Sequence, residues 1–370
     1  MVDLQGQYLK IKEDIDTAIR QVIDSSAFIG GPAVKAFASH LGKYLGGCHV
    51  ITCANGTDAL QIALMALGLR PGDEVIVPAF TYVASAEVIA LLGLTPVLVD
   101  VDPYTFNVTA EAIAQAITPR TRAIVPVHLF GQCCDMEPIL QLADEHHLFI
   151  VEDNAQAIGA EYTFSDGRRA KSGTMGTIGC TSFFPSKNLG CYGDGGALCT
   201  HDAALAERIR MIANHGQREK YHHDIVGCNS RLDTLQAAVL DVKLRHLDDY
   251  NRARREAADY YTEKLQDVNT LATPRCIYQS THVYHQYTLK VHDRDALKAH
   301  LASRGIPSMV YYPLPLHKQQ AFHGIARCCG DLTAATDCAA SVLSLPMHTE
   351  LTHNIQDTVI DAVIQFQKQH

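Results

Sequence analysis

Residues 74–101 read EVIVPAFTYVASAEVIALLGLTPVLVDV, and this stretch decides the fold. Its two apolar runs, residues 74–78 and 96–101, have the length and the Val/Ile/Leu content of buried strands. Residues 83–92 between them have the periodicity and length of a helix. Near-continuous apolar strands that alternate with helices are typical of a largely parallel sheet covered on both faces.

The same alternation extends from residue 50 to residue 200. Further strands are expected at residues 123–127, 148–152, 177–184 and 195–200, and further helices at residues 58–67, 110–117 and 136–144. Ligands of such sheets bind at the carboxyl ends of the strands. Polar residues that follow a predicted strand are therefore the first candidates for a functional site.

The rest of the chain has a different pattern. A helix is expected after Asp202, which is a good N-cap residue, and residues 229–273 lack Gly and Pro and predict a long, bent helix. Beyond it, strands are expected at residues 284–291 and 308–312, and helices at residues 293–303 and from residue 353. We therefore predict a large domain of residues 1–250 and a small α/β domain of residues 251–370.

The composition argues against several classes of protein. The 370 residues are 47% apolar and 19% charged, which is typical of globular proteins. A formal net charge of -9 without basic runs argues against nucleic acid as the main partner. The most apolar stretch, residues 88–99, is interrupted by Gly93 and Pro96 and is too short to span a membrane.

The cysteines do not form a recognisable framework. There are 12, they are scattered, and none belongs to a C-x-x-C pair, so zinc ribbons and thioredoxin-like motifs are not expected. Cys180 and Cys199 lie in apolar runs and are expected to be small buried hydrophobes. Residues 1–16 carry acids and lack an apolar signal core. We predict a reduced, cytoplasmic protein with no metal site.

Lys187 is the first candidate for chemistry. It follows the apolar strand predicted at residues 177–184 and precedes a turn that contains Gly190, Gly193, Gly195 and Gly196. A lysine in such a place can lie in a partly desolvated pocket, where a lowered pKa makes the amine nucleophilic enough for Schiff-base chemistry. The alternative is a surface lysine at the end of a strand.

Asp153 is the second candidate. It lies just past the strand predicted at residues 148–152, where it can pair with a cationic ring nitrogen of a bound heterocycle. The alternative is an Asp that caps a helix or a turn. Glu152 is the rival carboxylate, but the alternation of side chains along a strand points it the other way.

Two further motifs follow predicted strands. Asn55-Gly56-Thr57-Asp58 opens a helix, and its free N–H groups, glycine and hydroxyl can form an anion site or simply a helix cap. Tyr82 follows the strand at residues 74–78, where an aromatic ring can stack on a flat ligand or simply pack. The phosphate turn, the aromatic, the carboxylate and the lysine thus occur in this order, all after strands of one sheet.

With these motifs the chain resembles the DegT/DnrJ/EryC1/StrS family of nucleotide-sugar aminotransferases. The resemblance extends over essentially the whole chain. It is carried by DLQGQY (3–8), FIGG (28–31), NGTDAL (55–60), PAFTY (78–82), VHLFGQ (127–132), EDNAQA (152–157), SFFPSKNLG (182–190), GCNSRLDTLQAA (227–238) and YYPLPLH (311–317).

The resemblance implies a fold, a cofactor and a set of residue roles. The fold is type I of the pyridoxal-phosphate enzymes, with a mostly parallel seven-stranded sheet and a small C-terminal α/β domain. Lys187 would carry pyridoxal phosphate and shuttle protons. The other implied contacts are Asp153 to the pyridine nitrogen, Gln156 to the ring hydroxyl, Tyr82 stacked on the ring, and Gly56, Thr57 and Ser182 to the phosphate.

The family is dimeric with sites at the interface. Asn229 resembles the residue that reaches the phosphate in the neighbouring subunit. Arg231, Tyr312 and His317 match positions near the nucleotide sugar, although Arg231 could instead pair with Asp233. Because Lys187 is retained, the dehydratase variant with histidine at this position does not apply.

The implied reaction is transfer of an amino group from L-glutamate to a keto sugar linked to UDP or dTDP. Pro185, two residues before Lys187, resembles relatives that aminate C-3, whereas relatives acting on C-4 often carry His there. A 3-keto-N-acetylglucosaminuronate for lipopolysaccharide O-antigen or another surface polysaccharide is one candidate substrate. The alternatives are C-4 amination, desulfurase-type chemistry on the same fold, and a non-catalytic regulatory protein.

Overall fold

Eight strands form the central sheet of the computed structural model, which describes residues 1–369. In spatial order they are β1 (His49–Cys53), β9 (Gly196–Thr200), β8 (Ile178–Ser182), β5 (Phe149–Asp153), β4 (Thr121–Ile124), β2 (Glu74–Pro78), β3 (Thr95–Val99) and β14 (Arg327–Cys328). Of these, β9 alone runs against its neighbours, and the other strands share one direction. The predicted α/β class with a mostly parallel sheet is confirmed.

The predicted number of seven strands is too low by one. The additional strand, β14, pairs with β3 through Arg327 and Cys328 only. A strand of two residues has no hydrophobic period to recognise, so the sequence carries no signal for it.

Side chains of the parallel strands alternate between two cores. Val75 and Val77 of β2 face one core and Ile76 faces the other, which is why this strand is a continuous apolar run. The first core is covered by α4 (Gly56–Ala66), α5 (Ala84–Leu91), α8 (Ala203–Ala213) and α12 (Thr333–Ser341). The second core is covered by α6 (Ala110–Ala116) and α7 (Met136–Glu145).

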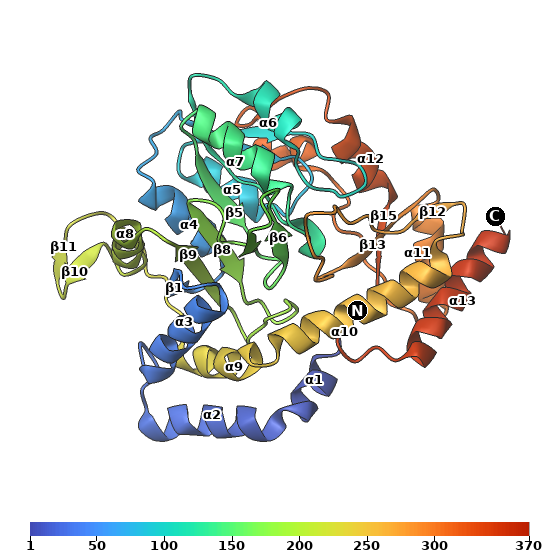
Figure 1. Cartoon of the computed structure of the whole chain (residues 1–370), viewed down its shortest axis with the longest axis horizontal. Helices are drawn as coiled ribbons and strands as arrows, with labels where there is room; N and C mark the ends of the chain where they lie inside the picture. The colour runs from blue at the N-terminus through green and yellow to red at the C-terminus, as the bar shows by residue number, and fades with distance from the viewer. Residues whose placement is uncertain (370) are drawn as a thin grey trace.

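Five further helices come from the N-terminal segment and from residues 234–265. They are α1 (Leu4–Lys10), α2 (Lys12–Ser25), α3 (Pro32–Tyr44), α9 (Thr234–Leu244) and α10 (Leu247–Leu265). Figure 1 shows α2, α3 and α9 at the lower edge of the molecule, with α10 running from α9 toward the C-terminal part. The long, bent helix predicted from residues 229–273 is thus two helices, α9 and α10, and α10 crosses residue 250.

A smaller sheet lies at the far end of α10 (Figure 1). Its antiparallel strands are β12 (Leu271–Ala272), β13 (Tyr287–Val291) and β15 (Val342–Leu345), and α11 (Arg294–Ser303) and α13 (His353–Gln369) cover it. Their apolar residues form a separate core that also includes Tyr261 and Leu265 of α10. The predicted strand at residues 284–291 and the helices at 293–303 and from 353 match β13, α11 and α13.

Short elements complete the fold. Two hairpins pair β6 (Glu161–Thr163) with β7 (Arg169–Lys171), and β10 (Gln217–Glu219) with β11 (His222–His223). The second hairpin projects from one side of the molecule in Figure 1. Short 3-10 helices span Leu129–Gly131, Leu316–Lys318 and Gln320–Phe322. No helix within residues 1–369 has both the length and the apolar character needed to cross a bilayer.

The strand predicted at residues 308–312 does not form. Only Met309 pairs with Ser344 of β15, through one isolated bridge. Pro307 and Pro313 flank the segment and lack the N–H groups that would extend the ladder. Its tyrosines, Tyr311 and Tyr312, instead line a cavity that is described below.

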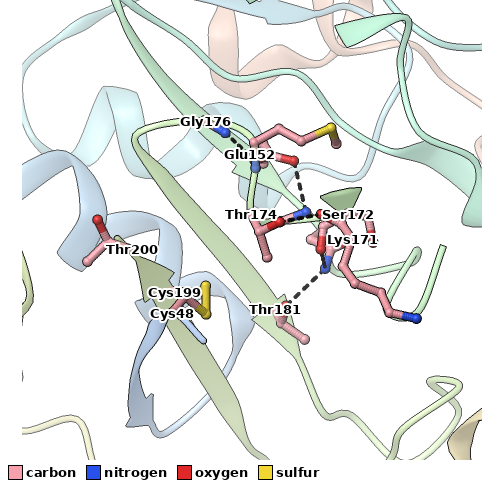
Figure 2. The surroundings of a disulfide bond; sticks show 12 residues. Cys48, Glu152, Lys171, Ser172, Thr174, Gly176, Thr181, Cys199 and Thr200 are labelled. Atoms are coloured by element: carbon pink, nitrogen blue, oxygen red, sulfur yellow. Dashed lines mark hydrogen bonds between the residues drawn. A yellow bond between two sulfur atoms is a disulfide. The ribbon is translucent and has the colours of Figure 1, made fainter. Parts of the chain in front are cut away.

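The prediction of a fully reduced chain is wrong for one pair of cysteines. Cys48 and Cys199 form a disulfide with a Cα–Cα separation of 6.1 Å (Figure 2). Cys48 directly precedes β1, and the antiparallel pairing of β1 with β9 brings it next to Cys199. Cys199 is nevertheless buried, as predicted, and Cys180 is buried with a free thiol.

Candidate active site

A cavity of about 470 Å³ lies at the carboxyl ends of the parallel strands. Residues that follow β1, β2, β5 and β8 form one wall, and residues 285–286 and 311–312 from the C-terminal part form the other. Eight of the predicted site residues line it, namely Gly56, Thr57, Tyr82, Asp153, Gln156, Ser182, Lys187 and Tyr312.

Lys187 comes from the turn that follows β8. Its backbone N–H donates to the carbonyl of Phe184 at 2.8 Å, and Gly190 permits the tight return, because a Cβ there would lie 2.4 Å from the Pro185 oxygen. The side chain borders the cavity and keeps intermediate exposure, while its ammonium group is desolvated. Burial therefore lowers the pKa of Lys187 to about 8, against the opposing effect of the Asp153 charge.

Asp153 is the last residue of β5, and its carboxylate is held in place. It is only 5% exposed, so its orientation depends on its hydrogen bonds. Oδ2 accepts a hydrogen bond from Ser85 Oγ at 2.7 Å, and Oδ1 accepts one from the Ala155 backbone N–H at 3.1 Å. A carboxylate held in this way can face a cationic ring atom without rotating away from it.

Glu152 faces the opposite side of the sheet, as predicted. His128 Nε2 lies 2.8 Å from its carboxylate, and the His128 Nδ1 accepts from the Cys134 N–H, so the Nε2 hydrogen points to Glu152. The backbone N–H groups of Gly173 and Gly176 also donate to Glu152, at 2.8 and 2.5 Å (Figure 2). The hydrogen bonds of this carboxylate thus go to His128 and to the loop at residues 173–176, and within residues 1–369 none goes to the cavity.

The start of α4 forms an anion-binding end of the cavity. Asn55 caps the helix by accepting from the Asp58 N–H at 2.8 Å, which leaves the first N–H groups directed at the cavity mouth. A Cβ on Gly56 would lie 2.6 Å from Ser182 Cβ, so only glycine lets the helix start pack against the end of β8. Gly56, Thr57 and Ser182 thereby meet in one place.

Aromatic rings form the opposite end. Tyr82 is 55% exposed, and its ring centroid lies 6.0 Å from that of Tyr312. Gln156 Nε2 donates to the Tyr312 hydroxyl at 3.0 Å, and its Oε1 accepts from the Phe130 N–H at 2.8 Å. Burial raises the pKa of Tyr312, so its hydroxyl stays protonated.

Three predicted site residues lie outside this cavity. Asn229 and Arg231 are exposed, and within residues 1–369 Arg231 forms no ion pair with Asp233 or any other acid. His317 lies next to α12, where its Nε2 is 3.3 Å from the Thr336 hydroxyl. The chain on its own therefore does not bring these three side chains to Lys187.

Sequence reasoning missed several residues of the site. Ser85 does not line the cavity but holds Asp153, and it lies three residues after Tyr82, in α5. Its bond to Asp153 joins α5 to the end of β5, two segments that meet only in the folded chain. His285 is 5% exposed, with burial holding its pKa well below the usual range, and Asp194 lines the mouth. The position of His285 depends on the approach of the C-terminal part, which no local pattern reveals.

Comparison with known proteins identifies the family. A sequence model of the DegT/DnrJ/EryC1/StrS aminotransferase family matches residues 9–364. The chain is 47% identical over 350 residues to a UDP-2-acetamido-2-deoxy-3-oxo-D-glucuronate aminotransferase of Pseudomonas aeruginosa, covering 95% of each protein. It is also 46% identical over 368 residues to a "pleiotropic regulatory protein" of Geobacillus stearothermophilus, covering 99% of this chain and 98% of the relative.

The fold agrees with a solved structure of the same group. DesV of S. venezuelae, in complex with a ketimine intermediate, matches with a TM-score of 0.94 and 42% identity, over 99% of this chain and 97% of DesV. Family match, sequence identity and fold thus agree over nearly the whole length. The chain belongs to the DegT/DnrJ/EryC1/StrS aminotransferase family, whose members are pyridoxal-phosphate enzymes with the type I fold.

Proposed function

We propose that this enzyme transfers the amino group of L-glutamate to the C-3 carbon of a keto sugar linked to UDP or dTDP. The observation that carries the proposal is the desolvated Lys187, which shares one cavity with Asp153 at the carboxyl ends of the sheet. The P. aeruginosa relative is named for a UDP-linked 3-oxo sugar, which supports both the substrate class and the position.

The cavity fits pyridoxal phosphate at both ends. The start of α4, with Gly56, Thr57 and Ser182, suits a phosphate, and the carboxylate of Asp153 suits a protonated ring nitrogen. The volume of about 470 Å³ is within the usual range for a cofactor site. When bound, the cofactor supplies an electron sink that stabilises negative charge on the reacting carbon.

We assign covalent attachment and proton transfer to Lys187. Schiff-base formation requires the neutral amine. With a pKa of about 8, roughly one-tenth of the Lys187 amine is neutral near pH 7, far more than for a lysine of ordinary pKa. The same amine can take a proton from the reacting carbon of the donor and return it on the cofactor side. Burial contributes here by making the lysine a weaker base than a surface lysine.

In this proposal, the neighbouring residues orient the cofactor ring and polarise it. Asp153, anchored by Ser85, keeps the ring nitrogen protonated. Tyr82 covers one face of the ring, and Gln156 contacts the ring hydroxyl while Phe130 and Tyr312 hold its amide. Tyr312 at the aromatic end is available to the sugar, whereas His317 would need a rearrangement to reach it.

We propose a homodimer with shared active sites. Asn229 and Arg231 are exposed and do not line the cavity of their own chain. Asn229 pairs with Asn214, so the two residues follow the β10–β11 hairpin, which projects from the molecule in Figure 1. Tyr221 and Val226 of the same segment are 78% and 85% exposed. Apolar side chains presented in this way favour burial against a second copy, whose cavity Asn229 and Arg231 would then complete.

The domain division, location and pathway remain part of this proposal. We retain residues 1–250 as the cofactor-binding domain and 251–370 as the small domain, with α10 joining the two. We propose a cytoplasmic location because ten of the twelve cysteines keep free thiols. The family resemblance supports a role in the O-antigen or another surface polysaccharide.

The test is product analysis with matched substrates. The purified enzyme, loaded with cofactor, is incubated with L-glutamate and a panel of 3-keto and 4-keto sugars linked to UDP or dTDP. We expect the 3-keto compounds to be aminated and 2-oxoglutarate to appear in equal amount. Amination of the 4-keto compounds alone would replace the C-3 proposal with C-4 amination.

The name of the G. stearothermophilus relative keeps a regulatory role as a second candidate. The retained Lys187 and the cavity around it favour catalysis. A purified protein that shows no absorbance band of bound cofactor, even after cofactor is added, would favour the regulatory role.

Hybrid dimers test the shared sites. Lys187→Ala and Asn229→Ala are each expected to be impaired, but a mixture allows one intact site to form from two different chains. We expect partial recovery of activity after subunit exchange. A mixture no more active than its parts would argue for sites built within one chain.

A further inference from the structure

A second cavity lies at the other end of the central sheet, where β8 begins and β9 ends. Its volume is about 520 Å³, which is similar to that of the candidate active site. Gly176, just before β8, lines this cavity, whereas Ser182 at the other end of β8 lines the active site. The remaining walls are residues 43–46 at the end of α3 and in the turn that follows it, Leu140 of α7, the β6–β7 hairpin and His201 after β9. We call this the basic cavity.

The residues that line the basic cavity carry a net positive charge, whereas the whole protein is negatively charged. Four permanently charged cations line the basic cavity, namely Lys43, Arg168, Arg169 and Lys171, and Glu161 is the one carboxylate among the lining residues. The whole chain has a formal net charge of -9. A local excess of three positive charges is therefore a property of this cavity and not of the composition.

The cations are held by specific contacts. Arg168 lies over the Phe164 ring, 4.1 Å from its centroid, and Lys171 lies over the Tyr44 ring at 4.7 Å. Lys171 and Arg169 share Glu161, at 3.0 and 3.8 Å. These contacts fix the direction of the side chains, so part of the entropy cost of ordering them for a ligand is already met.

The frame behind the cations is rigid. Glu152 holds the loop at residues 173–176 through the backbone N–H groups of Gly173, Met175 and Gly176 (Figure 2). The Cys48–Cys199 disulfide ties the turn after α3 to β9. Lys43 lies in the last turn of α3, and His201 directly follows β9.

The charges are not balanced within the protein. Glu161 can neutralise one of its two partners, and Asp166 lies 3.9 Å from Arg168 in a pair whose side chains are 66% and 64% exposed. Within residues 1–369, Lys43 has no carboxylate within ion-pairing distance. An anion that enters the cavity would therefore gain charge-assisted hydrogen bonds without breaking a buried ion pair.

We propose that the basic cavity binds a diphosphate group, either as inorganic diphosphate or as part of a nucleoside diphosphate. A diphosphate carries about three negative charges near neutral pH, and the four cations exceed Glu161 and the neighbouring Asp166 by two positive charges, so the ligand and the site have complementary charge. The volume is within the range that holds a small ligand. This site is separate from the proposed catalytic function and does not depend on it.

The test measures binding of inorganic diphosphate and of uridine 5′-diphosphate to the cofactor-loaded protein by calorimetry. The variant Lys43→Gln/Arg168→Gln removes one cation from each of two walls. Lys298→Gln/Arg304→Gln removes two exposed cations from the region of α11 and is the matched control. We expect the cavity variant to weaken inorganic diphosphate binding at least tenfold and the control to change it less than twofold.

Protection from acetylation locates the site. Bound diphosphate should slow the modification of Lys43 and Lys171 and leave Lys298 unaffected. Binding of uridine 5′-diphosphate but not inorganic diphosphate at Lys43 would identify the nucleotide as the source. Equal affinity in all three proteins, no protection of Lys43 and Lys171, or affinity for acidic peptides without affinity for either diphosphate would overturn the proposal.

Discussion

The two cavities of this molecule place their charges in different ways. The active-site cavity presents one desolvated lysine and one buried carboxylate, each held at the end of a strand. The basic cavity presents four cations, on the end of α3 and on the β6–β7 hairpin, and Lys43, Arg168 and Arg169 among them are exposed. At one end of the sheet, single buried residues carry the proposed reaction. At the other end, several cations together would attract an anionic ligand.

The comparison shows that burial determines the pKa of a lysine and therefore whether its amine can react. Lys187 has a pKa near 8 because water is excluded, so its amine can react. Lys243 shows that burial alone is insufficient, since its pKa is also lowered to about 8 but its Nζ donates to the Gly190 carbonyl at 2.8 Å. A reactive lysine needs both a lowered pKa and an open cavity in front of it.

The largest effect is expected at the lysine of the active-site cavity. Lys187→Ala removes the amine that attaches the cofactor and moves the proton, and general acid–base catalysis alone contributes about 100- to 10,000-fold. Turnover of a keto nucleotide sugar should fall by at least about 1,000-fold. Lys298→Ala on α11 is the control, and its turnover should match the wild type. Substantial activity in Lys187→Ala would contradict the proposed mechanism.

The next effect concerns the disulfide beside the basic cavity. Cys48 and Cys199 are separated by 151 residues, and the chain-entropy model gives about 5 kcal/mol for closing a loop of this length. Reductant or Cys48→Ser should lower the melting temperature by several degrees, and reductant should not change the Cys48→Ser protein further. Alkylation of all 12 cysteines without prior reduction would show that the bond is absent in solution.

A smaller effect is expected at the carboxylate of the active site. Asp153→Asn keeps the shape of the side chain, and its amide oxygen can still accept from the Ala155 N–H while its NH2 group donates to Ser85. The neutral amide cannot keep a ring nitrogen protonated. Activity should fall roughly 100-fold while the absorbance of bound cofactor remains, because one preorganised charge is lost. A near-normal rate would place the partner of the ring nitrogen elsewhere.

The pKa of Lys187 determines how the rate of cofactor uptake depends on pH. Below that pKa, the rate should change about tenfold per pH unit. In the protein without cofactor, the neutral amine is the form that attacks pyridoxal phosphate, and its fraction rises with pH until the pKa is passed. The rate of cofactor uptake should therefore rise up to about pH 8 and then level off, where a lysine of ordinary pKa would continue to rise. Stopped-flow absorbance between pH 6 and pH 10 provides the measurement.

The sequence predicted those parts of the fold that have a local signal. The strands at residues 74–78 and 148–152 are long apolar runs, and Lys187 and Asp153 were singled out because they follow such runs. The two residues of β14 and the contact of Cys48 with Cys199 have no such signal, since both depend on segments that meet only in the folded chain. His285 escaped prediction for the same reason.

The smallest effect is expected at Glu161 in the basic cavity. Its partly exposed pairs with Lys171 and Arg169 should contribute less than about 1 kcal/mol, so Glu161→Gln should leave the free energy of unfolding nearly unchanged. The same change removes the carboxylate that competes with a bound anion. Calorimetry should therefore show inorganic diphosphate binding tightened about threefold, which is the opposite sign to Lys43→Gln/Arg168→Gln. Weaker binding in Glu161→Gln would mean that the carboxylate positions the cations and that their contacts, not their excess charge, determine affinity.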